Sequence, residues 1–263
     1  MSRLLIGTAI SLAMVAGAAA ADFPIYSKTA ALSWTGFYVG GNAGDARGTS
    51  DVSFVFPPFN SGVPPLEAEG SPRLKPNGFT GGIQTGYNFQ AGRLVVGTEF
   101  DINYLGVSAS RQTLTKTVPF GLDPFNFAES IGTNWLLTVR PRIGLAIDRW
   151  FLYVTGGLAV GNHTFSQTLT FISPTGLLDI NSGTVSKVQA GWTAGLGLEY
   201  MITGNWSLKA EYLHVDLGQV GFDSTNTLVP TVTGDHDERL RIDIMRAGVN
   251  YKFDWYPLVT AKY

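Results

Sequence analysis

The sequence predicts an all-β protein, an eight-stranded antiparallel up-and-down transmembrane β-barrel with four long external loops and three short periplasmic turns. Three observations lead to this fold class. In the stretch SWTGFYVGGNAG, residues 33–44, large apolar residues alternate with glycine, threonine and asparagine, which is the period of a strand. Only 14% of the residues are charged, whereas a soluble domain has about 25%. Long and short gaps alternate strictly between the candidate strands, as in bacterial outer-membrane barrels.

The N-terminus reads as a secretory signal, and residues 1–20 are expected to be cleaved. Arg3 supplies a positive start, residues 4–15 form an apolar core, and Ala18-Ala19-Ala20 fits the small-residue cleavage rule. A membrane anchor is the alternative, but the apolar run is too short for one. No later segment offers the roughly 20 apolar residues that a spanning helix needs. An exported chain so poor in charge is either a secreted soluble β-protein or an outer-membrane barrel.

Residues 21–33 are expected to be a periplasmic linker, residues 34–253 the barrel, and residues 254–263 a C-terminal periplasmic extension. Three gaps inside the barrel are tight turns, at 90–92, 148–149 and 203–205, and four are long, at 46–76, 106–133, 162–188 and 218–239. An even number of strands places both ends of the barrel on the periplasmic side. The candidate strands are 34–45, 77–90, 93–105, 134–147, 150–161, 189–202, 206–217 and 240–253.

The two faces of these strands indicate which solvent each one meets. One parity is large and apolar, as in Leu152, Val154 and Leu158, and the other is mostly Gly, Thr, Asn and Ala. A soluble barrel would put the apolar set inside and would need many charges outside. Here the polar set is too small and too uncharged for a water-facing exterior, but it suits the narrow interior of a small barrel. The apolar set suits lipid, where strands must close into a barrel.

The tryptophans are predicted to form aromatic girdles at the two membrane interfaces. Their positions near strand ends are the basis, since a sandwich core would place some of them at strand middles. The predicted periplasmic girdle is Trp34, Trp150, Trp206 and Trp255, and the external one is Trp135 and Trp192.

A small set of charged residues falls on the inward parity and is predicted to form a charge network in the lumen. Charges in a narrow lumen must pair, because burying one unpaired charge costs roughly several kcal/mol of stability. The main interpretation is a structural network that plugs the barrel. A proton or ion path and a carboxylate pair for acid–base chemistry are the alternatives. The set is Glu99, Asp101, Arg140, Arg142, Glu199, Lys209, Glu211, Arg246 and Lys252.

The sequence offers no pattern typical of an enzyme, a metal site or a cofactor site. The absence of cysteine excludes disulfides, zinc–thiolate sites and a thiol nucleophile. His163 and His236 are expected in external loops, and His214 is expected to face lipid near the external end of its strand, without a serine at a useful spacing. A net charge of −2 does not indicate nucleic-acid binding. We therefore expect no catalytic, cofactor-binding or metal-binding residues and no enzymatic activity.

Several motifs resemble those of the small alphaproteobacterial outer-membrane β-barrel proteins, which are often labelled "porin family" or outer-membrane surface antigens. The resemblance covers residues 34–253. It implies an OmpA-like eight-stranded fold in the outer membrane of a Gram-negative bacterium. It also implies abundant surface proteins that stiffen the envelope, contact hosts or surfaces, and in some members bind haemin. The motifs are WTGFYVGGNAG at 34–44, TVRxRIG at 138–144, YxTGGLA at 153–159, GWTxGxGxEY at 191–200, EYLxVDLG at 211–218 and RxGVNYKF at 246–253.

The end of the last motif, with Val249, Tyr251 and Phe253, looks like the signal by which the barrel-assembly machinery recognises its clients. Ten residues follow it, so the signal is internal unless Tyr263 replaces Phe253 as the terminal aromatic. Pro141 also departs from the family pattern, which usually has glycine there. Because proline cannot donate to the ladder, a bulge or a missing bond is expected at Pro141.

The sequence predicts a monomeric structural barrel that is exposed at the cell surface. Its expected partners are outer-membrane lipid, the barrel-assembly machinery and an extracellular ligand or host surface. A narrow diffusion channel and the capture of haemin or another ligand by the loops are the alternative functions. Aromatic residues in the first long loop would form either a binding surface or part of a disordered loop; they are Phe54, Phe56 and Phe59.

Overall fold

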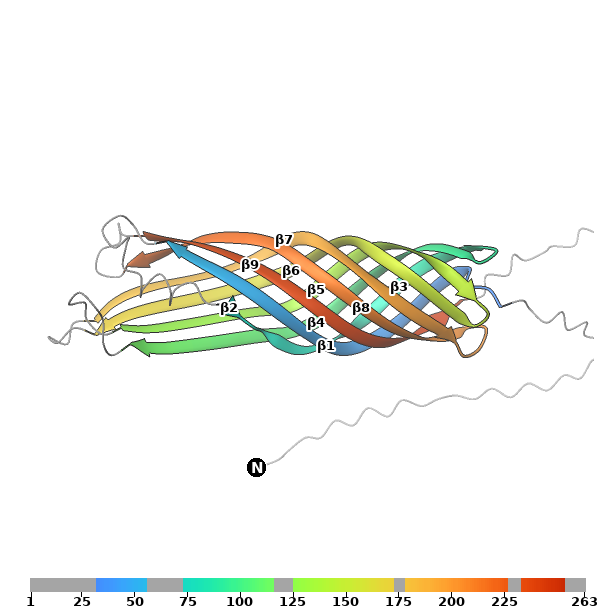
Figure 1. Ribbon diagram of the computed structural model, residues 1–263, viewed down its shortest axis with the longest axis horizontal. Coiled ribbons are helices and arrows are strands. Elements are labelled where there is room, and N and C mark those ends of the chain that lie inside the picture. The colour runs from blue at the N-terminus through green and yellow to red at the C-terminus, as the bar shows by residue number, and fades with distance from the viewer. Residues whose placement is uncertain (1–31, 56–72, 116–124, 173–177, 227–232, 254–263) are drawn as a thin grey trace, which may run out of the picture. The chain divides into compact units, whose positions relative to one another are not determined.

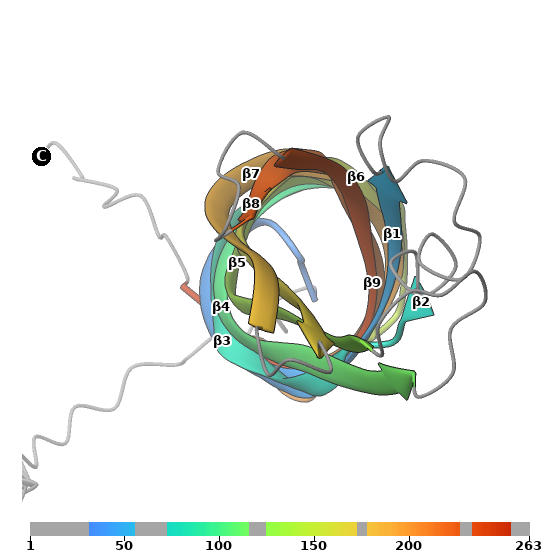
Figure 2. The same ribbon diagram turned by 90° about the vertical axis from the view of Figure 1, so that its left-hand side faces the viewer.

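The computed structural model describes residues 32–55, 73–115, 125–172, 178–226 and 233–253, which form one closed β-barrel (Figure 1). Neighbouring strands are antiparallel, and β1 pairs with β9 to close the ring that Figure 2 shows end-on. The predicted up-and-down barrel is confirmed, with the two-residue strand β2 added beside β1. The strands are β1 (Gly36–Val55), β2 (Arg73–Leu74), β3 (Asn77–Ala91), β4 (Leu94–Thr115), β5 (Phe125–Ile147), β6 (Trp150–Ile172), β7 (Leu178–Met201), β8 (Trp206–Asn226) and β9 (Thr233–Lys252).

Three short turns lie at one end of the barrel, here called the turn end, at the right of Figure 1. Gly92 (φ +61°) and Asp148 (φ +52°) adopt left-handed conformations in the β3–β4 and β5–β6 turns. Glycine does so without a steric penalty and aspartate tolerates it. The three predicted turns therefore lie where the sequence placed them. We call the opposite end the loop end. None of the described residues forms a helix that is long and apolar enough to cross a membrane.

The strands run much farther toward the loop end than the sequence predicted. A transmembrane strand needs about 9–11 residues, whereas β5 and β6 have 23 each and β7 has 24. The predicted loops 106–133, 162–188 and 218–239 are thus largely strand, and β1 continues to Val55 inside the predicted loop 46–76. Residues 56–72, which include Phe56 and Phe59, lie outside the described residues, and the side chain of Phe54 is not described.

The reason for this difference is an inversion of polarity along the strands. On the outward face of β6, the exposed residues Leu152, Val154 and Leu158 are followed by Thr164, Ser166 and Thr168. On its inward face, large apolar residues such as Phe165 become buried. A strand that is apolar outside suits lipid, and one that is polar outside suits water. The alternation that marks a strand continues, but its sense reverses where the barrel leaves the bilayer.

Local irregularities lie at this boundary. Ladder registers shift between Tyr104 and Val107, between Gly132 and Leu136, and between Asp216 and Gln219. At the second shift, the Asn162 side-chain oxygen accepts hydrogen bonds from the amides of Asn134 (2.8 Å) and Trp135 (3.1 Å).

At the third shift, Gly218 has φ +79° and donates its amide to the Asp216 carboxylate at 2.9 Å. A left-handed glycine is typical of such bulges. The motif EYLxVDLG therefore includes a bulge that the sequence did not predict.

Pro141 interrupts one ladder without a bulge. The β5–β6 pairs Val139–Leu158 and Arg142–Thr155 keep the same register, while no pair is formed at positions 140 and 141. The Thr155 hydroxyl donates to the Pro141 carbonyl at 2.9 Å. The predicted missing bond is thus present as a two-residue gap, because proline has no amide hydrogen to donate.

Candidate functional site: the charged lumen

The inward faces of five strands bring eight charged side chains into the middle of the barrel. Strand β4 supplies two carboxylates and its neighbour β5 supplies two arginines, while β7, β8 and β9 supply the rest. Strand periodicity explains the placement, because alternate residues project to the same side. Each of the eight residues has at most 5% of its surface exposed. They are Glu99, Asp101, Arg140, Arg142, Glu199, Lys209, Glu211 and Arg246.

Arg140 binds the two β4 carboxylates together. Its Nη2 atom lies 2.7 Å from Glu99 Oε1 and 2.7 Å from Asp101 Oδ2, and its Nη1 atom lies 3.3 Å from Glu211 Oε1. Asp101 also accepts hydrogen bonds from Thr138 (2.8 Å) and from Asn103. One guanidinium thus joins carboxylates from β4 and β8, which suits its fixed fork of donors.

Arg142 lies in an aromatic cage nearer the turn end. Its guanidinium carbon is 4.5 Å from the ring centroid of Tyr38, 5.2 Å from that of Tyr153 and 5.4 Å from that of Phe151. Its Nη1 atom pairs with Glu199 at 2.7 Å. Ring faces attract a guanidinium, and the attraction is strongest where water is excluded. The cage holds this member of the network at the side nearer the turn end.

The remaining two cations link the carboxylates across the lumen. Arg246 on β9 contacts Glu211 (2.6 Å) and Asp101 (3.0 Å), and Lys209 on β8 contacts Glu211 at 3.3 Å and also binds Glu99. Four carboxylates therefore face four cations, so the network is formally neutral. A neutral network in which every member pairs is the arrangement that limits the cost of burying charge.

Lys252, the ninth predicted member, lies toward the turn end, and its ammonium donates to the Ser33 carbonyl at 2.6 Å. It lines a small hollow with Trp34 and Glu199 that has room for about one water molecule, a volume of about 20 Å³. The structure thus places eight of the nine predicted residues in one network and Lys252 at its turn-end margin.

Sequence reasoning missed the uncharged residues that complete the network. The Tyr38 hydroxyl donates to Glu99 at 2.8 Å, and the Tyr153 hydroxyl donates to Glu211 at 2.9 Å. Asn88 accepts from Arg142 Nε at 2.9 Å. Their inward parity was visible in the sequence, but nothing in it distinguished these residues from others on the same parity.

An apolar layer fills the barrel on the loop-end side of the network, and it too was missed. Its residues are buried and in mutual contact. Some members of the layer, such as Ile131, Phe165 and Val185, lie in segments predicted as loops, whereas others lie inside predicted strands, where the apolar residues of the inward parity were overlooked. The layer includes Leu105, Val107, Leu136, Leu213, Val215, Leu217, Ile242 and Ile244. The lumen therefore holds a charged layer and an apolar layer in series.

The tryptophans predicted to form the girdles lie on both faces of the barrel wall. Trp150, Trp192 and Trp206 are each about half exposed on the outer wall, at 48–50%, and Trp135 is half-buried. Trp34 instead lies inside the barrel, with 3% exposure and its ring 5.3 Å from Phe151. Residue 34 shares the inward parity of Tyr38, so it cannot reach lipid. Trp255 lies outside the described residues.

The predicted assembly signal lies on the outer wall at the turn end. Val249 and Phe253 are exposed, at 40% and 42%. Phe253 packs against Phe37 (5.9 Å between ring centroids) and Tyr251 (5.1 Å), and Tyr251 packs against Trp206 at 5.0 Å. The role of these residues in assembly stays a prediction.

His163 and His236 are placed differently from the expectation, whereas His214 faces outward as predicted. His163 lies in β6, not in a loop, and its side chain is 1% exposed on the inward face. The backbone of His236 lies in β9, while its side chain is not described. His214 is on the outer wall, where its Nδ1 atom lies 2.8 Å from Asp243 and its ring lies 5.5 Å from Trp192. Among the described side chains, no group of three metal-binding residues gathers at one place.

Comparison with known proteins gives the family and the location. Residues 8–253 match the model of the outer membrane protein beta-barrel domain. The chain is 34% identical to the 31 kDa outer-membrane immunogenic protein of Brucella melitensis over 232 residues, 88% of each chain. It is 28% identical to the 22 kDa outer membrane protein of Rhizobium leguminosarum bv. viciae, over 73% of this chain and 68% of that one.

Among solved structures, the chain is similar to the attachment invasion locus protein Ail of Yersinia pestis. The TM-score is 0.34 and the identity is 16%, over 81% of this chain and 99% of that one. The expected resemblance to small alphaproteobacterial outer-membrane barrels is confirmed by the family match and the relatives. The chain belongs to the outer membrane protein beta-barrel domain family, and it is an outer-membrane protein of the Gram-negative type.

Proposed function

We propose that this outer-membrane barrel has a closed lumen and serves as a structural, surface-exposed protein. The observation that carries the proposal is the filled lumen. Eight mutually paired charges lie in one layer and a packed apolar layer follows it toward the loop end. Solute would have to displace both layers. In this proposal the contacts of the two layers stabilise the barrel and do not form a path for solute.

A narrow diffusion channel is the first rival. It would need a water-filled path lined by charges that remain accessible to ions. The network charges have at most 5% exposure, and the hollow at the turn-end margin holds about one water molecule. These features favour a plug over a selectivity filter.

In this proposal the external half of the barrel is the part that is exposed at the cell surface and contacts other molecules. Strands β4 to β7 extend far beyond the length needed to cross a bilayer, and their outward faces turn to serine and threonine. The Brucella relatives are named immunogenic proteins, which fits exposure of the same region in those proteins. We propose a non-enzymatic contact surface here.

Capture of haemin by exposed histidines is less well supported. The inward, buried position of His163 removes one of the two proposed external ligands. His236 alone would then have to supply an axial contact.

The closed lumen is tested by single-channel recording in planar bilayers. The protein isolated from outer membranes is inserted, and its folding is verified by circular dichroism and by a heat-dependent shift on gels. Silent bilayers with folded protein are the expected result. Steady open-channel steps whose ion selectivity changes in Glu99→Gln would contradict the proposal and make the network a selectivity filter.

A further inference from the structure

A groove runs along the lipid-facing side of β1. Gly41 lies directly between Ile83 on β3 and Val249 on β9, so a position without a side chain is flanked by two exposed large ones. The groove has a volume of about 500 Å³ and an almost wholly apolar lining, with Phe100 and Trp206 at its sides. Next along β1, Ala43 lies opposite Ala247 and Gly81. A shallow apolar track therefore points along β1 toward the loop end.

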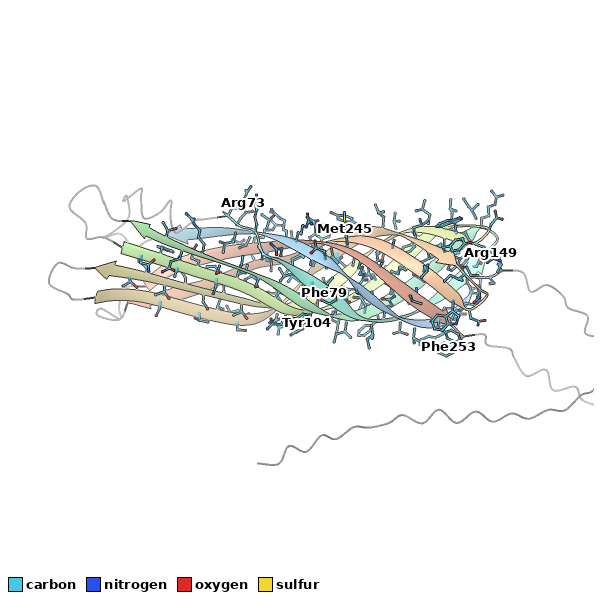
Figure 3. All side chains as sticks on the ribbon, turned by 90° about the horizontal axis from the view of Figure 1, so that it is seen from below. Arg73, Phe79, Tyr104, Arg149, Met245 and Phe253 are labelled. Atoms are coloured by element: carbon cyan, nitrogen blue, oxygen red, sulfur yellow. The ribbon has the colours of Figure 1, made fainter. Side chains whose placement is uncertain are left out.

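A second hollow of a different character lies farther along the same strand. It has a volume of about 600 Å³ and is lined by polar and charged residues, among them Arg47, Lys75, Asn77 and Thr49. Asp45 lies in its wall, four residues beyond Gly41, which corresponds to roughly 14 Å along a strand. Phe79 and Met245 project from the wall on either side of Asp45 (Figure 3). The apolar groove and the polar hollow thus follow one another along β1.

Among the residues that the structure describes, Lys75 is the cation of this hollow that has no ion-pair partner. Arg47 pairs with Asp45 at 2.9 Å, and Asp243 accepts hydrogen bonds from Tyr212 (2.7 Å) and pairs with His214 (2.8 Å). Lys75 is exposed and has no carboxylate within ion-pair distance among the described residues. The Arg47–Asp45 pair is largely exposed (81% and 57%), so it is weak and can rearrange. The hollow therefore offers an ammonium and a guanidinium to an anion.

We propose that β1 carries a binding site for a phosphorylated lipid of the outer leaflet. One acyl chain lies in the groove over Gly41, and a phosphate contacts Lys75 and Arg47, two residue types that bind phosphate well. The order of the two hollows along the strand matches an amphiphile, whose apolar and charged parts are joined. A second copy of the chain is the other possible occupant, but it would have to cover the charged hollow as well as the groove.

The sequence allows each half of the site to be changed separately. A Cβ added at Gly41 meets only the Gly82 carbonyl, at an ordinary 3.7 Å, so Gly41→Leu fills the groove without straining the wall. Lys75→Gln removes the charge at the other end. Ala194→Leu places the same leucine side chain on the exposed lipid-facing side of β7, and Arg93→Gln removes an exposed cation at the turn end. These two variants are matched controls.

The experiment is native mass spectrometry of the full protein in detergent, titrated with diphosphorylated lipid A and with the same lipid after removal of its phosphates. We expect the phosphorylated lipid to bind, and Lys75→Gln to weaken binding about tenfold, as for one lost charge-assisted contact. Gly41→Leu should also weaken binding, because the new side chain occupies the acyl groove, while both controls bind normally. Equal binding of the dephosphorylated lipid would overturn the proposal, as would unchanged affinity in the two variants. A dimer that Gly41→Leu abolishes would overturn it in favour of a second copy.

Discussion

Glu99 on β4 and Arg140 on β5 are direct cross-strand partners, and their side chains meet at 2.7 Å inside the barrel. Glu99 also pairs with Arg142 at 3.3 Å, binds Lys209, and accepts a hydrogen bond from the Tyr38 hydroxyl at 2.8 Å. Arg246 on β9 lies 3.7 Å from the same carboxylate, so Glu99 connects strands β1, β4, β5, β8 and β9. Removing the charge of Glu99 would therefore weaken contacts to several strands at once.

Replacing Glu99 with glutamine is expected to destabilise the barrel strongly. The amide keeps the shape but leaves four buried cations, Arg140, Arg142, Lys209 and Arg246, short of a counter-charge. Breaking a buried pair costs about 3–5 kcal/mol. The free energy of unfolding, measured by denaturant titration in detergent with tryptophan fluorescence, should fall by about that amount. Asp45→Asn is the control, since its pair with Arg47 is exposed and worth at most about 1 kcal/mol. Equal losses in the two variants would mean that the buried network contributes little.

Two closed layers in series give a prediction about conductance. Lys209→Met removes one charge from the network, but the apolar layer with Leu105, Leu136 and Leu213 remains on the loop-end side. We expect bilayers that contain this variant to stay silent in single-channel recordings. Open steps produced by Lys209→Met alone would show that the charge network is the only barrier.

The bulge near Gly132 depends on the side chain of Asn162. In Asn162→Ala, the amides of Asn134 and Trp135 lose their acceptor, and a hydrogen bond lost in this way costs about 1–3 kcal/mol. The same denaturant titration should detect the loss. Thr164→Ala on the same strand is the control, because its hydroxyl shares only an exposed contact with Ser186 at 3.2 Å. A loss no larger than that of the control would show that water replaces the Asn162 oxygen.

The membrane-spanning part of the fold was predictable because strand periodicity and the low charge content carry the information locally. Glu99, Arg140 and Arg142 could be assigned to the lumen from parity alone, and their adjacency followed from the up-and-down order. Parity also decides against Trp34 as a girdle residue, since it shares the inward face with Tyr38. Position near a strand end therefore does not place a tryptophan at the interface; its parity must also point outward.

The external half was harder to predict because the sign of the alternation reverses there. Outside the bilayer, Thr164 and Ser166 face outward and Phe165 faces inward. A strand defined by apolar residues on its outward face therefore ends at the membrane edge, and its external continuation looks like a loop. Register shifts near Gly132 and Gly218 also change the parity between the two halves of a strand. Tertiary pairing, and not the local pattern, fixes where these bulges lie.

The polarity inversion along β6 predicts where the bilayer ends, and the absence of native cysteine makes the prediction testable by labelling. Thr168 and Leu158 lie on the same outward face of one strand, but Thr168 belongs to the serine and threonine segment and Leu158 belongs to the apolar band. In intact cells, Thr168→Cys should react with a membrane-impermeant maleimide and Leu158→Cys should not, because lipid covers it. After detergent solubilisation and denaturation both should react, which shows that each thiol is present. Labelling of Leu158→Cys in intact cells would shift the membrane boundary toward the turn end, and protection of Thr168→Cys would place the serine and threonine face within the membrane or under another part of the cell surface.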